Sequence, residues 1–199
     1  MTTTIDALVD LGVLGPTERF GADLIARRWF IEDDTTLLAV ALAIWADRTG
    51  HVGLDLVRIA PVLERARRTP GAAAITEPLP PLPDGPSFHR ALAAHERSAV
   101  RVLPDAPGTA AAALADLRPI VLWRDRLYTQ RQFADERSVA EQVATRTESA
   151  PITDRATADA FLARAADDLD PSQRAAVETA LSRRLTVITG GPGTGKTFT

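Results

Sequence analysis

Apolar residues recur at helical spacing through the first fifty residues. Ile5, Leu8, Val9 and Leu11 follow one another at about 3.6-residue intervals, and the pattern stops at Gly12. The same spacing returns twice more before residue 48. Residues 4–47 are therefore predicted to form a series of short helices.

Candidate start signals separate these helices. Gly15-Pro16 divides the first from the second, which Thr17 is placed to cap. Asp33 or Asp34 is placed to cap the third. The third helix would bury one face, formed by Leu38, Leu42 and Trp45.

The next segment mixes turns with shorter elements. Gly50-His51-Val52-Gly53-Leu54 predicts a turn before a short extended segment or a new helix, and residues 56–68 predict a helix whose start is limited by Pro61. Six prolines within residues 69–86 predict a loop or linker. Helices are then expected over about 87–103 and, rich in alanine, over 109–117.

The pattern changes near residue 119. Pro119 to Trp123 and Arg126-Leu127-Tyr128 are short apolar runs on either side of a turn-like Arg124-Asp125, which predicts a small β-hairpin. A helix is expected to follow over about 130–147.

The last fifty residues are predicted to contain two helices and a strand. Pro151 ends the preceding helix, and Thr153 or Asp154 could cap the next one, running to about 168. A further helix is expected to run to about Arg184. The β-rich run Leu185 to Thr189 follows, and glycines come directly after it.

Composition excludes several classes of protein. The chain of 199 residues has no cysteine, so disulfides, Cys-based zinc sites and thiol nucleophiles are ruled out. No apolar run approaches the roughly 20 residues that cross a bilayer. Because the first residues lack the layout of a signal peptide, we expect a cytoplasmic protein without a membrane partner. The formal charge of −3 gives no support to nucleic-acid binding through bulk charge.

Lysine is almost absent from the chain. Of 23 basic residues, Lys196 is the one lysine and the others are arginines. Together with the excess of alanine, this bias most simply reflects coding preference. A lysine retained in such a background still draws attention to its surroundings.

Those surroundings form a phosphate-binding motif. Residues 190–197 read Gly-Gly-Pro-Gly-Thr-Gly-Lys-Thr and satisfy G-x-x-x-x-G-K-[ST], directly after a β-type run. Glycines allow φ values that side chains forbid, and their N–H groups can form an anion nest. A helix starting near Gly195 would direct its positive end at the same phosphates. The predicted nucleotide-binding residues are Gly190, Gly191, Pro192, Gly193, Thr194, Gly195, Lys196 and Thr197.

Two of these residues have distinct chemical roles. Lys196, the predicted catalytic residue, would place a compact ammonium on the β- and γ-phosphates of ATP. The Thr197 hydroxyl would help to hold Mg²⁺. An ordinary glycine-rich turn is the competing interpretation.

Gln173, upstream of this loop, has two possible roles. Asp170 is a good N-cap, Pro171 suits the first helical position, and Gln173 at N3 would complete a capping box. Alternatively, its primary amide could recognise adenine, donating to a ring nitrogen while accepting from the exocyclic amine. The local pattern favours neither.

The segment Leu169 to Thr199 resembles superfamily 1 DNA helicases and, more narrowly, the RecD family, the alpha subunit of exodeoxyribonuclease V. The resemblance rests on residues 173–177, on residues 181–188 and on the loop 189–197. Two upstream segments strengthen it. Residues 50–54 resemble a Gly-His-Val segment of the RecD N-terminal domain, and residues 119–140 resemble the hairpin and helix before the motor.

The sequence departs from the family pattern at two places. Phe198 stands where the family often has a small polar residue, and Thr129-Gln130 interrupts the usual aromatic spacing of the hairpin. For residues 60–115, the resemblance to the family rests only on their position between the matching segments.

The resemblance implies a 5′-to-3′ DNA translocase that uses ATP and Mg²⁺. It implies work within a three-subunit helicase–nuclease that processes double-strand ends for recombinational repair, with beta and gamma subunits as partners and docking mainly on gamma. It also favours Gln173 as an adenine contact. Residues 1–110 hold 11 arginines and 14 acidic residues, which agrees with protein docking better than with DNA binding.

We therefore expect a mostly α-helical N-terminal domain with a small β-hairpin, followed by the incomplete start of a RecA-like α/β P-loop motor. The predicted domains are 1–110 for subunit docking, 111–168 as hairpin and linking helices, and 169–199 as the start of the motor.

A P-loop ATPase also needs a second acidic motif and further parallel strands. Neither follows Thr199, so we expect an N-terminal portion of a longer protein that does not hydrolyse ATP alone. The alternatives are an interaction module with an unformed P-loop and, more remotely, a small-molecule kinase.

Overall fold

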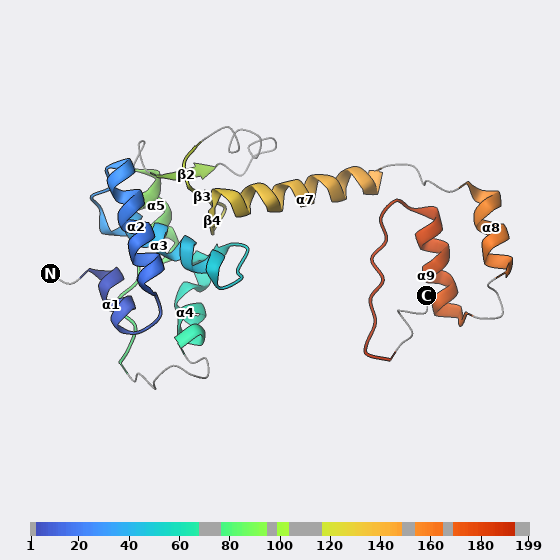
Figure 1. The fold of residues 1–199 in the computed structure, drawn as a ribbon, viewed down its shortest axis with the longest axis horizontal. Coiled ribbons are helices and arrows are strands. Elements are labelled where there is room, and N and C mark those ends of the chain that lie inside the picture. Colours follow the sequence, from blue (N-terminus) through green and yellow to red (C-terminus); the bar gives the residue numbers. More distant parts are fainter. Residues whose placement is uncertain are drawn as a thin grey trace. The chain divides into compact units, whose positions relative to one another are not determined.

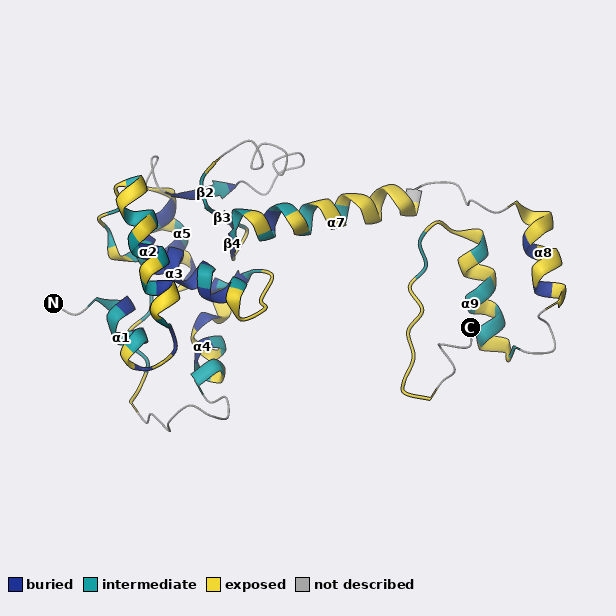
Figure 2. Ribbon diagram, viewed as in Figure 1, coloured by how far each residue is buried: buried dark blue, intermediate teal, exposed yellow. Residues whose placement is uncertain are grey.

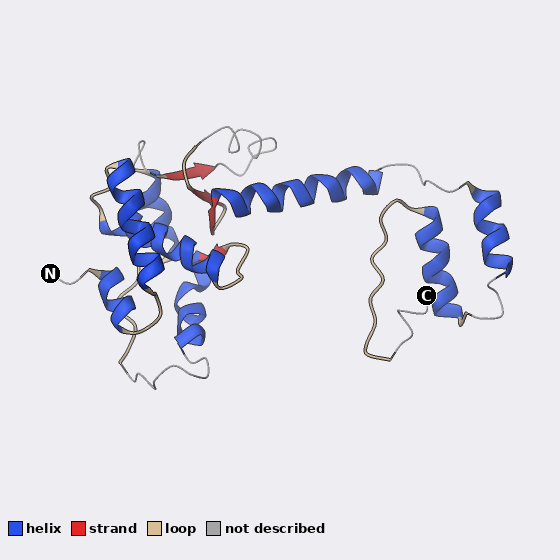
Figure 3. Cartoon of the chain, in the orientation of Figure 1, coloured by secondary structure: helices blue, strands red, loops and turns tan. Residues whose placement is uncertain are grey.

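The computed structural model describes residues 3–67, 77–94, 99–103, 117–148, 154–164 and 169–193. The chain divides into two compact units, Met1–Arg137 and Ser138–Thr199. Helices predominate in both, and a small sheet lies in the first (Figure 3). Among the described residues, none of the helices combines the length and the apolar character needed to cross a membrane.

The first unit begins with three helices, α1 (Thr4–Asp10), α2 (Pro16–Trp29) and α3 (Asp34–Arg48) (Figure 1). Asp33 caps α3, accepting a hydrogen bond from the Thr36 N–H at 2.7 Å. The predicted cap of α2 is wrong, because Gly15 occupies the N-cap position and Pro16 the first turn. Proline suits that position because its fixed φ is already helical.

Helix α3 is the centre of the core. Its side chains Leu38, Leu42 and Trp45 are at most 2% exposed, which confirms the predicted buried face. Alanines fill much of the remaining surface of α3, so the helix is buried on nearly all sides (Figure 2). The largest contacts of α3 are with α2, and it also packs against α1 and against α5 (Gly85–Ala93).

A turn after α3 leads into short elements. Strand β1 (Leu54–Asp55), the 3₁₀ helix η1 (Leu56–Arg58) and α4 (Ile59–Arg67) follow in order. Residues 77–84 of the predicted proline-rich linker contain no helix or strand, and residues 68–76 lie outside the described part. Asp84 then caps α5 through the Ser87 N–H at 2.8 Å.

The sheet has four strands in the order β1–β4–β3–β2. Strands β3 (Ile120–Trp123) and β4 (Arg126–Thr129) form the predicted antiparallel hairpin, and β1 pairs antiparallel with β4. Strand β2 (Val100–Leu103) pairs parallel with β3.

Strand β2 corrects one prediction. A helix was expected over 87–103, whereas α5 ends at Ala93 and Val100–Leu103 is extended. Valines at positions 100 and 102 favour the pleated conformation, and the pairing with β3 supplies the backbone partners. The alanine-rich helix expected over 109–117 falls almost wholly outside the described residues.

Helix α7 (Gln130–Glu148) begins directly after β4. Its Phe133 is buried and contacts the rings of Tyr128 and Trp123 edge-on, at 5.5 and 5.8 Å between centroids. These side chains, with Val121 and Leu103, form a second, smaller core over the sheet. The hairpin and the first turns of α7 are therefore one packed unit.

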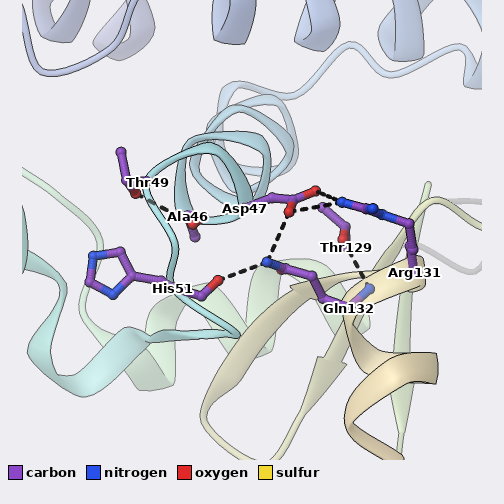
Figure 4. Close-up of polar contacts among 7 residues, drawn as sticks. All are labelled: Ala46, Asp47, Thr49, His51, Thr129, Arg131 and Gln132. Atoms are coloured by element: carbon purple, nitrogen blue, oxygen red, sulfur yellow. Dashed lines mark hydrogen bonds and ion pairs between the residues drawn. The ribbon is translucent and has the colours of Figure 1, made fainter. Parts of the chain in front are cut away.

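Polar contacts join the start of α7 to the end of α3 and to the turn after it (Figure 4). The Arg131 guanidinium donates to both Asp47 carboxylate oxygens at 3.1 Å. The Gln132 amide donates to Asp47 at 3.0 Å and to the His51 carbonyl at 2.7 Å. The His51 ring stacks on Trp45, with 5.4 Å between centroids. Residues 50–54 and 119–140, which are separate in the sequence, thus meet in one structure.

The second unit contains the end of α7, helix α8 (Arg155–Arg164) and helix α9 (Pro171–Ser182). Asp154 caps α8, accepting from the Thr157 N–H at 3.0 Å, which selects one of the two predicted caps. Helices α8 and α9 pack against each other.

The β-rich run Leu185 to Thr189 forms no strand among the described residues, which corrects that prediction. A strand requires ladder partners, and no described segment pairs with this run. Val187 is 79% exposed.

Candidate nucleotide-binding site

The N-terminus of α9 holds a complete capping box. The Asp170 carboxylate accepts hydrogen bonds from the Gln173 N–H at 3.0 Å and the Ser172 N–H at 2.7 Å. In return, the Gln173 side-chain oxygen accepts from the Asp170 N–H at 3.0 Å. The capping role predicted for these two residues is therefore confirmed.

The capping box also lowers the pKa of Asp170. A hydrogen bond from the Ser172 hydroxyl, followed by the Gln173 N–H, lowers the pKa of Asp170 below its ordinary value. The shift favours the ionised carboxylate, which is also favoured at the positive end of a helix.

The box leaves part of the Gln173 amide available. Its oxygen uses one of two lone pairs on the Asp170 N–H. An adenine contact needs the second lone pair and the amide NH₂, so capping and adenine recognition are chemically compatible. The adenine contact itself stays a prediction.

The predicted P-loop lies partly within the described residues. Gly190, Gly191, Pro192 and Gly193 follow the extended segment after α9, and Gly193 has a φ of +77°. This left-handed conformation strains any residue with a side chain, which gives a physical reason for glycine at this position. Open space surrounds the place where a Cβ would lie, which suits a backbone that approaches a ligand.

The predicted loop has four further residues. Thr194, Gly195, Lys196 and Thr197 lie outside the described part of the chain. Their predicted roles, with Lys196 on the phosphates and Thr197 on Mg²⁺, stay predictions.

A pocket that the sequence did not predict lies between α8 and α9, with a volume of about 790 Å³. Its lining includes the ion pairs Arg155–Asp159, at 3.1 Å, and Arg174–Glu178, at 3.3 Å. Both pairs join residues four apart on one helix, a spacing that stabilises exposed helices without implying a ligand. Gln173 and the loop glycines are not among the residues lining this pocket.

Comparisons with known proteins agree with these features. A family described as an AAA domain matches residues 173–199. Over 171 residues, 84% of this chain, the sequence is 34% identical to the RecBCD enzyme subunit RecD of Mycolicibacterium smegmatis. It is 35% identical, over the same share, to the protein of that name from Mycobacterium tuberculosis strain H37Rv.

The similarity covers most of this chain but a small part of its relatives. The chain spans 24% of the length of each RecD protein that it matches. At that identity, and with most of this chain covered, the match shows the family. The chain belongs to the RecD family.

Proposed function

We propose that this chain is part of a RecD-type subunit of an ATP-dependent DNA helicase–nuclease, and that residues 190–197 bind the phosphates of ATP. The observation that supports the proposal most directly is the G-x-x-x-x-G-K-T loop, placed after a capped helix within a RecD-like sequence. An unrelated glycine-rich turn would not be expected in that combined setting.

Each loop residue has a stated chemical role in the proposal. The N–H groups of the glycines would bind phosphate oxygens, for which the left-handed Gly193 provides a suitable backbone. Lys196 would bind the β- and γ-phosphates, and Thr197 would hold Mg²⁺, which supplies charge neutralisation when bound. Gln173 would bind adenine through its amide.

The partners follow from the relatives' name. RecD is named as a subunit of the RecBCD enzyme. We therefore propose that the protein assembles with the beta and gamma subunits of exodeoxyribonuclease V, mainly through gamma, and acts on double-strand DNA ends for recombinational repair. The net acidic first 110 residues support a protein-docking role for that region. The 5′-to-3′ direction of translocation is part of the same proposal.

The proposal is tested in the assembled complex. Lys196→Ala in the whole subunit should abolish ATP-driven unwinding by this subunit but leave co-purification with the beta and gamma subunits unchanged. The matched control is Arg184→Ala, which removes one positive charge from the same unit. Unwinding that survives Lys196→Ala would contradict the nucleotide-binding role.

The second candidate is an interaction module with an unformed P-loop. It predicts the same co-purification, together with ATP affinity that Lys196→Ala leaves unchanged. The two candidates therefore differ in one measurable property, the dependence of nucleotide binding on Lys196.

A further inference from the structure

Helix α2 leaves one apolar side exposed. Phe20 is 71% exposed and Leu24 is 58% exposed, although both are large apolar side chains. Residues four apart lie one turn apart on the same side of a helix, and Arg27, three residues further on, extends this exposed side. Exposed positions recur along α2 in Figure 2. We refer to Phe20, Leu24 and Arg27 as the outer face of α2.

The opposite side of α2 accounts for its place in the fold. Ala22 is fully buried, and a Cβ at Gly21 would lie 2.7 Å from a side-chain carbon of Ile44, on α3. Ile25 is partly buried against the same core. The packing of α2 on α3 therefore uses residues other than the outer face. Because exposed apolar side chains contribute little to stability, the fold of this unit does not explain Phe20 and Leu24.

The residue after α2 adds a third exposed apolar side chain. Phe30 is 87% exposed and has a φ of +53°, the left-handed conformation in which glycine usually ends a helix. A side chain strains the backbone in this conformation, and an exposed phenyl ring gains little from burial. Phe20 and Phe30 are the two most exposed phenylalanines in the described part of the chain. Phenylalanine at position 30 therefore opposes the fold, which points to a role outside it.

Two arginines at the end of α2 have no acidic partner. Arg27 and Arg28 form no ion pair within the described residues, although Arg28 lies over the ring of Trp29, 6.0 Å from its centroid. By contrast, Arg19 on the same helix pairs with Asp23 at 3.5 Å. The apolar side of α2 thus ends in positive charge that a partner with acidic groups would complement.

Other occupants match this face less well. In a second copy of the chain the same face would meet itself, and the nearest exposed acids in the sequence, Glu32 and Asp34, follow α2 and are not on its outer face. Anionic membranes and nucleic acids are disfavoured by charge, because residues 1–110 hold 11 arginines and 14 acidic residues. A protein surface with its own carboxylates is the class that remains.

We propose that the outer face of α2, together with Arg28 and Phe30, docks in an apolar groove bordered by carboxylates on the gamma subunit. The identity of the partner rests on the proposed function, whereas the face and its chemistry rest on the exposed side chains. Aromatic residues and arginine are enriched at protein interfaces, and a few buried anchors supply most of the binding energy. Arginines at the rim chiefly speed association.

The test is association of the whole subunit with an immobilised complex of the beta and gamma subunits. Biolayer interferometry would give both rate constants at low and high salt, about 50 and 500 mM. Phe20→Ser/Leu24→Ser should raise the dissociation rate and weaken affinity at least about tenfold at both salt concentrations, because apolar burial is not screened by salt. Arg27→Ala/Arg28→Ala should slow association several-fold at low salt and have little effect at high salt.

Phe30→Gly separates docking from folding. Glycine adopts the left-handed conformation freely, so this variant should keep or raise the thermal unfolding midpoint while docking several-fold more weakly. The matched control is Val52→Ser/Val57→Ser, which removes two other exposed apolar side chains from the same unit. The control should associate within twofold of the original subunit.

The possible failures are distinguishable. Equal affinity of the original subunit and Phe20→Ser/Leu24→Ser would overturn this assignment and leave the proposed partner intact. No association by the original subunit would contradict the proposed partner and the docking assignment with it.

Two further results would give the face to another occupant and overturn the proposal. One is a dimer of the isolated subunit, seen by sedimentation equilibrium, that Phe20→Ser/Leu24→Ser abolishes. The other is co-sedimentation with phosphatidylserine-containing vesicles that Arg27→Ala/Arg28→Ala abolishes.

Discussion

At the scale of single residues, the glycines of the turn after α3 are explained by their surroundings. Gly50 has a φ of +81°, and a Cβ on Gly53 would lie 2.5 Å from a ring carbon of the buried Tyr128. The sequence predicted a turn in this segment, and its resemblance to a RecD segment drew further attention to it. The structure adds that the segment packs on the hairpin. The residues in contact are more than seventy positions apart in the sequence, so no local pattern could reveal the contact.

Gly53→Ala should therefore destabilise the first unit. The added methyl group must displace a ring that is only 1% exposed, and overpacking of this kind costs about 1–3 kcal/mol in the free energy of unfolding. Urea denaturation followed by circular dichroism measures the loss. Gly85→Ala is the control, because its nearest atoms lie at an ordinary 3.6 Å and no loss is expected.

Gln173→Glu separates the two roles of Gln173. Glutamate at N3 preserves the capping box, since its carboxylate can accept the Asp170 N–H. It lacks the amide donor that adenine recognition requires. We expect unchanged helix stability together with roughly tenfold weaker ATP binding, as one lost hydrogen bond is worth about 1 kcal/mol or more. Unchanged ATP affinity would contradict adenine recognition and leave helix capping as the role of Gln173.

At the scale of elements, local signals predicted helices well, and non-local pairing was missed. Asp33, Asp154 and Asp170 each cap a helix through neighbours two or three residues away, so sequence alone could find them. Strand β2 depends on β3, some twenty residues further along, and its short valine pattern was absorbed into a predicted helix. The sheet therefore could not be derived beyond its hairpin.

Glu18 joins α2 to α3 and should be important for the stability of that pair. Its buried carboxylate accepts from the Gly15 N–H at 2.7 Å and pairs with Arg48, at the end of α3. Glu18→Ala should cost about 2 kcal/mol, the typical contribution of hydrogen bonds to a charged group. Glu18→Gln keeps an acceptor and should lose less, as measured by thermal unfolding. Equal effects of the two substitutions would contradict a role for the charge.

The caps of α8 and α9 should make the second unit sensitive to acid. Hydrogen bonds from Thr157 and Ser172 lower the pKa of Asp154 and Asp170 below the ordinary 3.8. A lowered pKa stabilises the folded state above the unfolded pKa, and this stabilisation is lost as pH falls through the folded pKa. Helical circular dichroism should decrease below about pH 4, and Asp154→Asn/Asp170→Asn, which retains capping side chains, should decrease less.

At the scale of the whole molecule, features of both units agree with the assignment to the RecD family. In the first unit, residues 50–54 and 119–140, which both resemble RecD segments, are in contact. The second unit contains the glycine-rich loop, whose described part has one left-handed glycine. The loop motif could be predicted from the sequence because its residues are contiguous. The pocket at the turn of the β3–β4 hairpin could not, because its lining residues come from η1, β3, β4 and α7, which are separate in the sequence.

The most direct test of the central claim is the ATP affinity of the whole subunit, measured by equilibrium dialysis with Mg²⁺ present. The original subunit and Arg184→Ala should bind ATP with equal affinity. Lys196→Ala should reduce binding by at least tenfold, because it removes the ammonium that the P-loop places on the phosphates. Equal binding by all three chains, or no binding by any of them, would contradict the proposed nucleotide site.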